Sequence, residues 1–116
     1  EKISEQHPSE SSEAVRSRVI RAREIQKKRF AGHQGIYCNA QMGSQQLQQF
    51  CALSEDCLNL LRTAMQRMSL SARAYDRILK VARTIADLEG TPDILASHIA
   101  EAILYRTLDK EAWGTN

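Results

Sequence analysis

Aromatic residues make up only 5% of this 116-residue chain, and no long uninterrupted apolar segment occurs in it. The scarcity of aromatics implies a core built mostly from aliphatic side chains. No apolar run approaches the roughly 20 residues of a membrane-spanning helix, so we expect no membrane partner. The polar opening EKISEQHPSESS lacks the apolar stretch of a secretion signal. We therefore expect a cytoplasmic protein.

Cysteine is also sparse, and charge of either sign is nearly balanced. Cys38, Cys51 and Cys57 form no CxxC pair and have no histidine at zinc-finger spacing, so we expect reduced, partly buried thiols and no metal site. The net charge of +2 is too small to indicate nucleic-acid binding by itself. Its distribution is uneven, because residues 14–33 carry seven Lys or Arg and one acid, whereas residues 87–111 carry six acids and two bases. We expect these two segments to pack side by side.

Helical patterns account for most of the chain. Apolar residues recur at helical spacing, and no segment has the period of two that a strand shows. The first two predicted helices cover residues 12–31 and 45–51. A third follows Ser54 and includes Met68, the fourth covers residues 71–89, and the last begins between residues 92 and 96 and ends near residue 110. The predicted N-caps are Ser11 or Ser12, Ser44, Ser54 and Ser71, and Gly90 ends the fourth helix. The fold class is all-α, a compact bundle of about five helices.

The fourth helix is predicted to lie at the centre of the bundle, because apolar residues occupy half of its circumference. The predicted buried positions on that helix are Ala74, Tyr75, Ile78, Leu79, Val81, Ala82, Ile85, Ala86 and Leu88. Narrower apolar stripes are expected on the first helix (Val15, Val19, Ala22, Ile25, Phe30) and on the last (Leu95, Ile99, Ala102, Ile103). Residues 32–43 are glycine-rich and are predicted to connect two helices, with Asn39 bonding to nearby backbone.

The opposite face of the fourth helix carries a row of cations, which begins in an unfavourable place. Arg73 follows the cap residue Ser71 by two positions, where the positive end of the helix dipole disfavours a cation. Arg77 and Lys80 continue the row. One interpretation is a solvated polar face, with Arg77 offset by an acid such as Asp76 or one on a neighbouring helix. The other is an anion site, since a helix N-terminus attracts phosphate and an arginine fork fits its oxygens.

The segments LSARAYDRILKVARTIADLEG and HIAEAILYRTLD, together with VRSRVIRAREIQKKRF and YCNAQM upstream, closely resemble the C-terminal part of magnesium-chelatase-like AAA+ ATPases of the ComM/YifB type. The match covers roughly residues 12–110. More distantly, the fourth helix is similar to a helix in the lid of magnesium chelatase and of replicative MCM helicases.

The resemblance implies an AAA+ lid that packs over a nucleotide. The lid helix of that family begins with a sensor-2 arginine that points at the γ-phosphate of ATP, and Arg73 holds the matching position. Arg77 and Lys80 are candidates for a secondary phosphate or interface contact. In the chelatase and MCM branch the lid is displaced, so Arg73 serves either its own subunit's nucleotide or a neighbour's. The family implies a hexameric ring, and the ComM type acts on DNA branch migration during natural transformation.

The sequence also departs from an intact ATPase of this kind. It contains no GxxxxGK[ST] loop and no acidic Walker B strand, so we expect no catalytic residue, no metal ligand and no bound ATP with Mg²⁺ in this chain alone. The expected domains are a linker from an absent ATPase core (1–11), a helical lid (12–112) and a tail (113–116). The expected partners are that core and neighbouring ring subunits.

The alternative function is a separate basic helical module that binds nucleic acid or protein. On this interpretation the first helix presents its cations to phosphates. The candidate residues are Arg16, Arg21, Arg23, Lys27, Lys28 and Arg29. Against it, the sequence shows no recognition-helix turn and no row of aromatic residues on which bases could stack.

Overall fold

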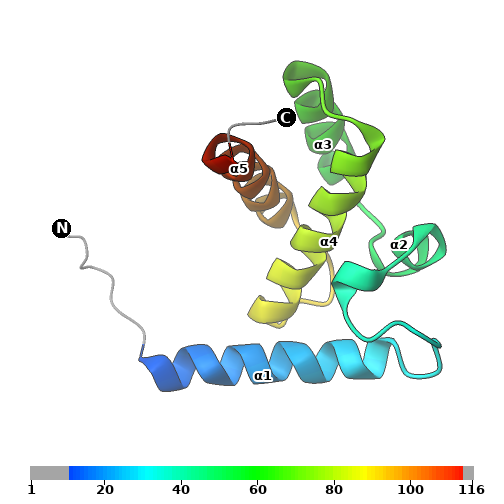
Figure 1. Ribbon diagram of the computed structural model, residues 1–116, viewed down its shortest axis with the longest axis vertical. Coiled ribbons are helices and arrows are strands. Elements are labelled where there is room, and N and C mark those ends of the chain that lie inside the picture. Colours follow the sequence, from blue (N-terminus) through cyan, green and yellow to red (C-terminus); the bar gives the residue numbers. More distant parts are fainter. Residues whose placement is uncertain (1–10, 114–116) are drawn as a thin grey trace.

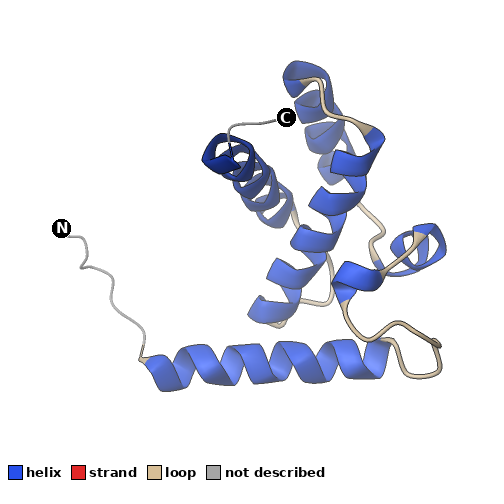
Figure 2. Cartoon of the chain, in the orientation of Figure 1, coloured by secondary structure: helices blue, strands red, loops and turns tan. Residues whose placement is uncertain are grey.

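The computed structural model describes residues 11–113, with side chains to residue 105, and within that range all regular structure is helical. The predicted all-α bundle of five helices is confirmed (Figures 1 and 2). The elements are α1 (Ser12–Arg29), the 3₁₀ turn η1 (Asn39–Gln41), α2 (Ser44–Phe50), α3 (Glu55–Met68), α4 (Ala72–Glu89) and α5 (Ala96–Trp113). The predicted linker at residues 1–11 and the predicted tail lie almost entirely outside the described residues, although α5 includes Trp113.

Helix α4 lies at the centre of the bundle, as its wide apolar face predicts. It contacts α1, α2, α5 and η1, and Figure 1 shows it beside α5, with its upper end near α3 and its lower end reaching α1. Six of the nine predicted apolar positions are buried: Ala74, Ile78, Leu79, Ala82, Ile85 and Ala86. The other three, Tyr75, Val81 and Leu88, are half-buried. The helix also buries two charged residues, Arg83 and Asp87, which the apolar pattern does not predict.

Helix α1 crosses the lower end of α4 and extends beyond it on the N-terminal side (Figure 1). This geometry explains where the predicted apolar stripe fails. Ala22 and Phe30 are buried, but Val15 is 41% exposed, because the first turns of α1 have no neighbouring helix to pack against. The helix ends at Arg29, with Phe30 as its C-cap, two residues before the predicted end.

Three of the predicted N-caps and the predicted glycine cap are confirmed. The hydroxyls of Ser11, Ser54 and Ser71 each accept from the backbone N–H three residues ahead. Gly90 ends α4 with φ +77°, in the left-handed region that glycine occupies without a steric cost. The prediction for Ser44 is wrong, because Gly43 is the N-cap of α2 and its N–H donates to Gln46 Oε1 at 2.9 Å.

The prediction that Leu95 is buried is also wrong. Leu95 immediately precedes α5 and is 48% exposed, whereas its neighbour Ile94 is 4% exposed. The backbone N–H of Leu95 donates to Nδ1 of the fully buried His98 at 2.9 Å. The first turn of α5 is thus capped from inside the helix, and this geometry directs Leu95 outward and Ile94 into the core. Ile99 and Ala102 are buried as predicted.

No helix within residues 11–113 is long and apolar enough to cross a membrane. The three cysteines are free thiols; Cys51 and Cys57 are buried and Cys38 is half-buried. Both buried thiols belong to the core, which is mainly aliphatic as predicted. Burial raises the pKa of the Cys51 thiol to about 11, so this side chain is not a nucleophile near neutral pH.

Candidate functional site

The N-terminus of α4 leaves Arg73 exposed to solvent. Ser71 is the N-cap, with an extended backbone and a hydroxyl that accepts from Ala74 N–H at 3.2 Å. Arg73 is therefore the second residue of the helix, in a first turn that contains no acid. Arg73 therefore adds a positive charge to the turn that carries the positive end of the helix dipole. An anion at this end of α4 would interact favourably with both.

The predicted cation row on α4 divides into two parts. Arg73 and Arg77 are exposed at the N-terminal half. Lys80 is half-buried, and its ammonium donates to the carbonyl of Ala40 at 3.2 Å. Thr84, one turn further on, donates to the carbonyl of Lys80 and accepts from Asn39 Nδ2 at 3.0 Å. The C-terminal half of the row thus holds the connector between α1 and α2, while the N-terminal half faces solvent.

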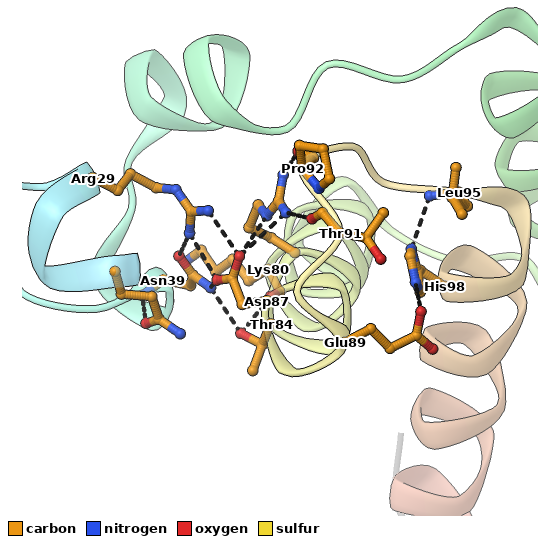
Figure 3. A network of polar contacts seen from close by, with 12 residues as sticks. Arg29, Asn39, Lys80, Thr84, Asp87, Glu89, Thr91, Pro92, Leu95 and His98 are labelled. Carbon is orange, nitrogen blue, oxygen red and sulfur yellow. Dashed lines mark hydrogen bonds and ion pairs between the residues drawn. The ribbon is translucent and has the colours of Figure 1, made fainter. Parts of the chain in front are cut away.

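A buried ion-pair network lies beside this C-terminal half, centred on Asp87 (Figure 3). The guanidinium of Arg29 binds the carboxylate in two-point fashion, with both N–H···O distances at 2.8 Å. Asn39 adds a third donor at 2.9 Å, from Nδ2 to Oδ2. Asp87 itself is 1% exposed. This geometry is the strong form of charge-assisted hydrogen bond.

Arg83 completes the network and extends it to the loop after α4. Its Nε donates to Asp87 Oδ1 at 3.2 Å, and its two terminal nitrogens donate to the carbonyls of Pro92 and Thr91 at 3.0 and 2.9 Å. The network therefore joins the end of α1, η1, the last turns of α4 and the α4–α5 loop. Elements that are far apart in sequence are held together by one carboxylate.

Two arginines share this single carboxylate, so neutral groups must balance the second positive charge. The Asn39 side-chain oxygen accepts from Arg29 at 2.9 Å, and Arg83 has two carbonyl partners. The Arg29 guanidinium also lies 6.0 and 5.9 Å from the ring centroids of Phe30 and Phe50, within cation–π range. Every charged group of the network thus has compensating partners, which is the condition for burying it.

The sequence pattern did not predict this network. One feature of the sequence could have pointed to it, namely the unfavourable position of Asp87 in the dipole of its own helix. An acid in the last turn of a helix opposes the negative end of the dipole, just as Arg73 opposes the positive end. The expectation that segments 14–33 and 87–111 pack side by side is met only in part. Arg29 pairs with Asp87 at the end of α4, but α5, which holds most of the second segment, does not pack closely against α1 over the described residues. The expectation that Asn39 bonds to nearby backbone is wrong, because its side chain reaches Arg29, Thr84 and Asp87 instead.

His98 is a second buried polar residue that the sequence did not single out. Its Nδ1 accepts from Leu95 N–H, which leaves the ring proton on Nε2, and Nε2 lies 2.8 Å from Glu89 Oε1. The ring is inaccessible to solvent, whereas the Glu89 side chain is 55% exposed. This pair links the start of α5 to the end of α4 (Figure 3).

The candidate cations of α1 differ in their surroundings. Arg29 was expected on the surface, but it belongs to the buried network. The other five are exposed. At 100° per residue, Arg16, Arg23 and Lys27 lie within about 40° of one another, whereas Arg21 and Lys28 lie together on a different side. No group of three or more His, Cys, Asp or Glu side chains within the described residues could hold a metal ion.

Comparison with known proteins identifies the family to which this chain belongs. Residues 9–106 match the family described as "Magnesium chelatase, subunit ChlI C-terminal", and the chain belongs to this family. It is 43% identical over 99 residues to "Competence protein ComM" of Haemophilus influenzae, and 41% identical over 103 residues to "Uncharacterized protein YifB" of Escherichia coli. It is 37% identical over 97 residues to "Uncharacterized protein Rv2897c" of Mycobacterium tuberculosis.

These alignments cover most of this chain but little of each relative. They include 85%, 89% and 84% of the chain, and 18%, 19% and 19% of the respective relatives. The chain therefore corresponds to the C-terminal domain of magnesium-chelatase-like ComM/YifB proteins. What a longer protein of this type does is a separate question.

Proposed function

We propose that this domain is the lid of an AAA+ ATPase, and that Arg73 is its sensor-2 residue. In this proposal the guanidinium of Arg73 contacts the γ-phosphate of ATP, which is held with Mg²⁺ mainly by the ATPase core of the same protein. The nucleotide belongs either to the same subunit or to a neighbour in a ring. Arg77 and Lys80 are secondary candidates for phosphate or interface contacts.

The observation that carries this proposal is the exposure of Arg73 in the first turn of α4. A cation there opposes the helix dipole and costs the isolated domain a few tenths of a kcal/mol. The same position becomes favourable once a phosphate binds near the free N–H groups of that turn. A planar two-point donor suits phosphate oxygens better than a lysine would.

The Asp87 network supports the second part of the proposal, which concerns coupling. Because Arg29, Asn39 and Arg83 tie α1, η1 and the α4–α5 loop to the same carboxylate, a displacement of α4 carries its neighbours with it. We infer that the domain moves as one rigid body between nucleotide states and thereby changes the conformation of the ring. For the full-length protein we propose a task on DNA, such as branch migration, or a chelatase-like remodelling reaction.

The test compares Arg73→Ala with Arg77→Ala in the full-length ATPase. An arginine finger can contribute 10³–10⁵ in rate, so a sensor should contribute part of that, and we expect Arg73→Ala to lower ATP turnover at least about tenfold. Arg73→Lys should recover little, because it restores the charge without the fork. Arg77→Ala is the matched control from the same exposed row, and we expect nearly normal turnover.

Thermal unfolding of this domain provides a second readout. Arg73→Ala should leave its stability unchanged or slightly increased, because the substitution removes an unfavourable interaction with the dipole. Arg77→Ala should cost no more than about 1 kcal/mol, the range of exposed charges. Equal turnover in the two full-length variants would show that Arg73 is only a surface residue.

A further inference from the structure

A groove of about 960 Å³ lies between the C-terminal half of α1 and the connector that follows it. Figure 1 shows this connector as the cyan loop at the end of α1, away from α5. Arg23 and Lys27 line the groove from the helix, and Ile36, Tyr37 and Cys38 line it from the loop. The site is therefore separate from the start of α4, where Arg73 lies.

The charge of this groove is of one sign. None of the described residues that line it is acidic. Arg23 and Lys27 are one helical turn apart and both are exposed. Arg16 lies on the same side of α1 about 10 Å before Arg23, from the rise of 1.5 Å per residue. The groove thus opens at the end of a row of three cations, which suits a linear polyanion.

The groove also presents an aromatic ring to solvent. Tyr37 is 75% exposed, the most exposed of the large apolar side chains on the described surface. The loop that carries it turns through Gly32 and Gly35, at φ +87° and +83°. Beneath the loop, His33 packs edge-on against Phe30 and Phe50, with ring centroids 6.1 and 5.7 Å away. The base of the loop is therefore packed against aromatic rings, while the Tyr37 side chain is exposed.

One buried polar atom beside the groove lacks a partner. Nδ1 of His33 is buried and makes no hydrogen bond within the described part of the chain. Buried polar atoms are rarely left in that state. His33 is itself among the residues that line the groove.

We propose that this groove binds a single strand of nucleic acid, with one base stacked on Tyr37 and the adjacent phosphates on Arg23 and Lys27. Stacking on an exposed ring requires a base that is free of its own helix, which favours a single strand over a duplex. An acidic peptide would use the two cations but would leave the exposed ring without a role. The inference does not depend on the sensor role of Arg73.

The test is binding of a fluorescently labelled thymidine oligonucleotide of about 12 residues, measured by anisotropy at several salt concentrations without ATP. We expect Tyr37→Ala to weaken binding about 5- to 100-fold, as removal of one base stack does, and Tyr37→Phe to retain it. Arg23→Ala with Lys27→Ala should weaken binding and lower the salt slope by about 0.7 for each phosphate that the protein no longer neutralises.

The matched control removes two other cations from the same helix. Arg21→Ala with Lys28→Ala changes the net charge equally, but these residues are not among those that line the groove. All the substituted side chains are exposed, and circular dichroism will verify that each variant is folded. We expect the control to bind nearly as tightly as the original chain.

Three results would overturn the proposal. They are no measurable binding of the oligonucleotide, equal losses of affinity in the two double variants, and binding of a glutamate-rich peptide that is tighter than that of the oligonucleotide and insensitive to Tyr37→Ala. A ribose oligonucleotide in parallel shows whether the strand is DNA or RNA. Because none of these assays involves ATP, failure here is distinct from failure of the Arg73 proposal, which the turnover assay measures.

Discussion

At the scale of single residues, Asp87 has the largest structural role that the polar contacts reveal. It is the only carboxylate that Arg29 and Arg83 contact in the described network, and it is fully buried. Removing one member of a buried ion pair is strongly destabilising, because the other charge stays buried without a partner. Replacing the whole pair by apolar residues often costs little. Substitution of Asp87 should therefore lower the stability of the domain more than substitution of an exposed acid.

We therefore predict that Asp87→Asn destabilises the domain by about 3–5 kcal/mol, measured by chemical denaturation. The substitution conserves volume but leaves two arginines without a carboxylate. Asp93→Asn is the control, because Asp93 is exposed and such changes usually fall within about 0.5 kcal/mol. A difference of less than about 1 kcal/mol between the two variants would mean that the network contributes little to stability.

Cys51 gives the domain a pH dependence at alkaline pH. Burial raises the pKa of its thiol to about 11, only partly opposed by the nearby positive charges of Arg83 and Arg29. The ordinary pKa of a solvated thiol is 9.0, so the unfolded chain loses this proton first. The stability due to the protonated thiol is therefore fully present below pH 9 and is lost as the pH rises from 9 to about 11.

We predict that the stability advantage of the original chain over Cys51→Ala shrinks over this pH range. The measurement is the free energy of unfolding of both proteins at about pH 8 and about pH 10.5, on either side of the ordinary thiol pKa. Tyrosine and lysine residues titrate in both proteins, so their contributions largely cancel in the difference. An advantage that stayed constant with pH would show that the folded state tolerates the thiolate.

At the scale of elements, the start of α5 is held by a side chain from within the helix. His98 accepts from the N–H of Leu95 and bonds to Glu89 at the end of α4. It thereby satisfies one of the backbone donors that a helix N-terminus leaves free. It also fixes the turn between the two helices, whose mutual contact is the most extensive in the fold.

We predict that His98→Ala destabilises the domain by about 2–4 kcal/mol, since it leaves a cavity and an unpaired donor. His98→Asn should recover part of this stability, because its side-chain oxygen can accept from Leu95 N–H in place of Nδ1. Thermal unfolding gives the stability, and hydrogen exchange of the Leu95 amide reports the cap directly. Ser97→Ala, an exposed neighbour, is the control. Equal effects of Ala and Asn at position 98 would contradict the capping role.

At the scale of the whole molecule, the proposed function gives this chain only part of a nucleotide site. It contains no GxxxxGK[ST] loop, and Arg73 with the first turn of α4 represents a small fraction of the contacts that hold ATP and Mg²⁺ in such enzymes. The proposed function therefore assigns the chemistry to a core domain and the sensing to this one.

We predict that this 116-residue chain alone releases no phosphate from ATP above the buffer background, and that it binds ATP with only weak, supramicromolar affinity. Phosphate release and calorimetric titration are the measurements. Sustained turnover, or submicromolar affinity, would require a phosphate site that the lid interpretation does not include.

Much of the fold was predictable from local signals. The caps Ser11, Ser54 and Ser71 and the stop at Gly90 depend on backbone groups within a turn of the chain, so their sequence signature is direct. The central position of α4 followed from the width of its apolar face. The errors at Ser44, Leu95 and Val15 arose where a neighbouring side chain or the absence of a packing partner decided the outcome.

By itself the sequence determined the helical class, the order of the helices and the exposed arginine at the start of α4, because these depend on periodicity and on the nearest turns of backbone. Only the tertiary structure decided which charges are buried. Arg29 and Asp87 are 58 residues apart, and their pairing exists because α1 crosses the end of α4. The groove beside Tyr37 likewise depends on how the connector folds back on α1. Contacts of this kind are set by the packing of whole elements, on which the local pattern of residues carries little information.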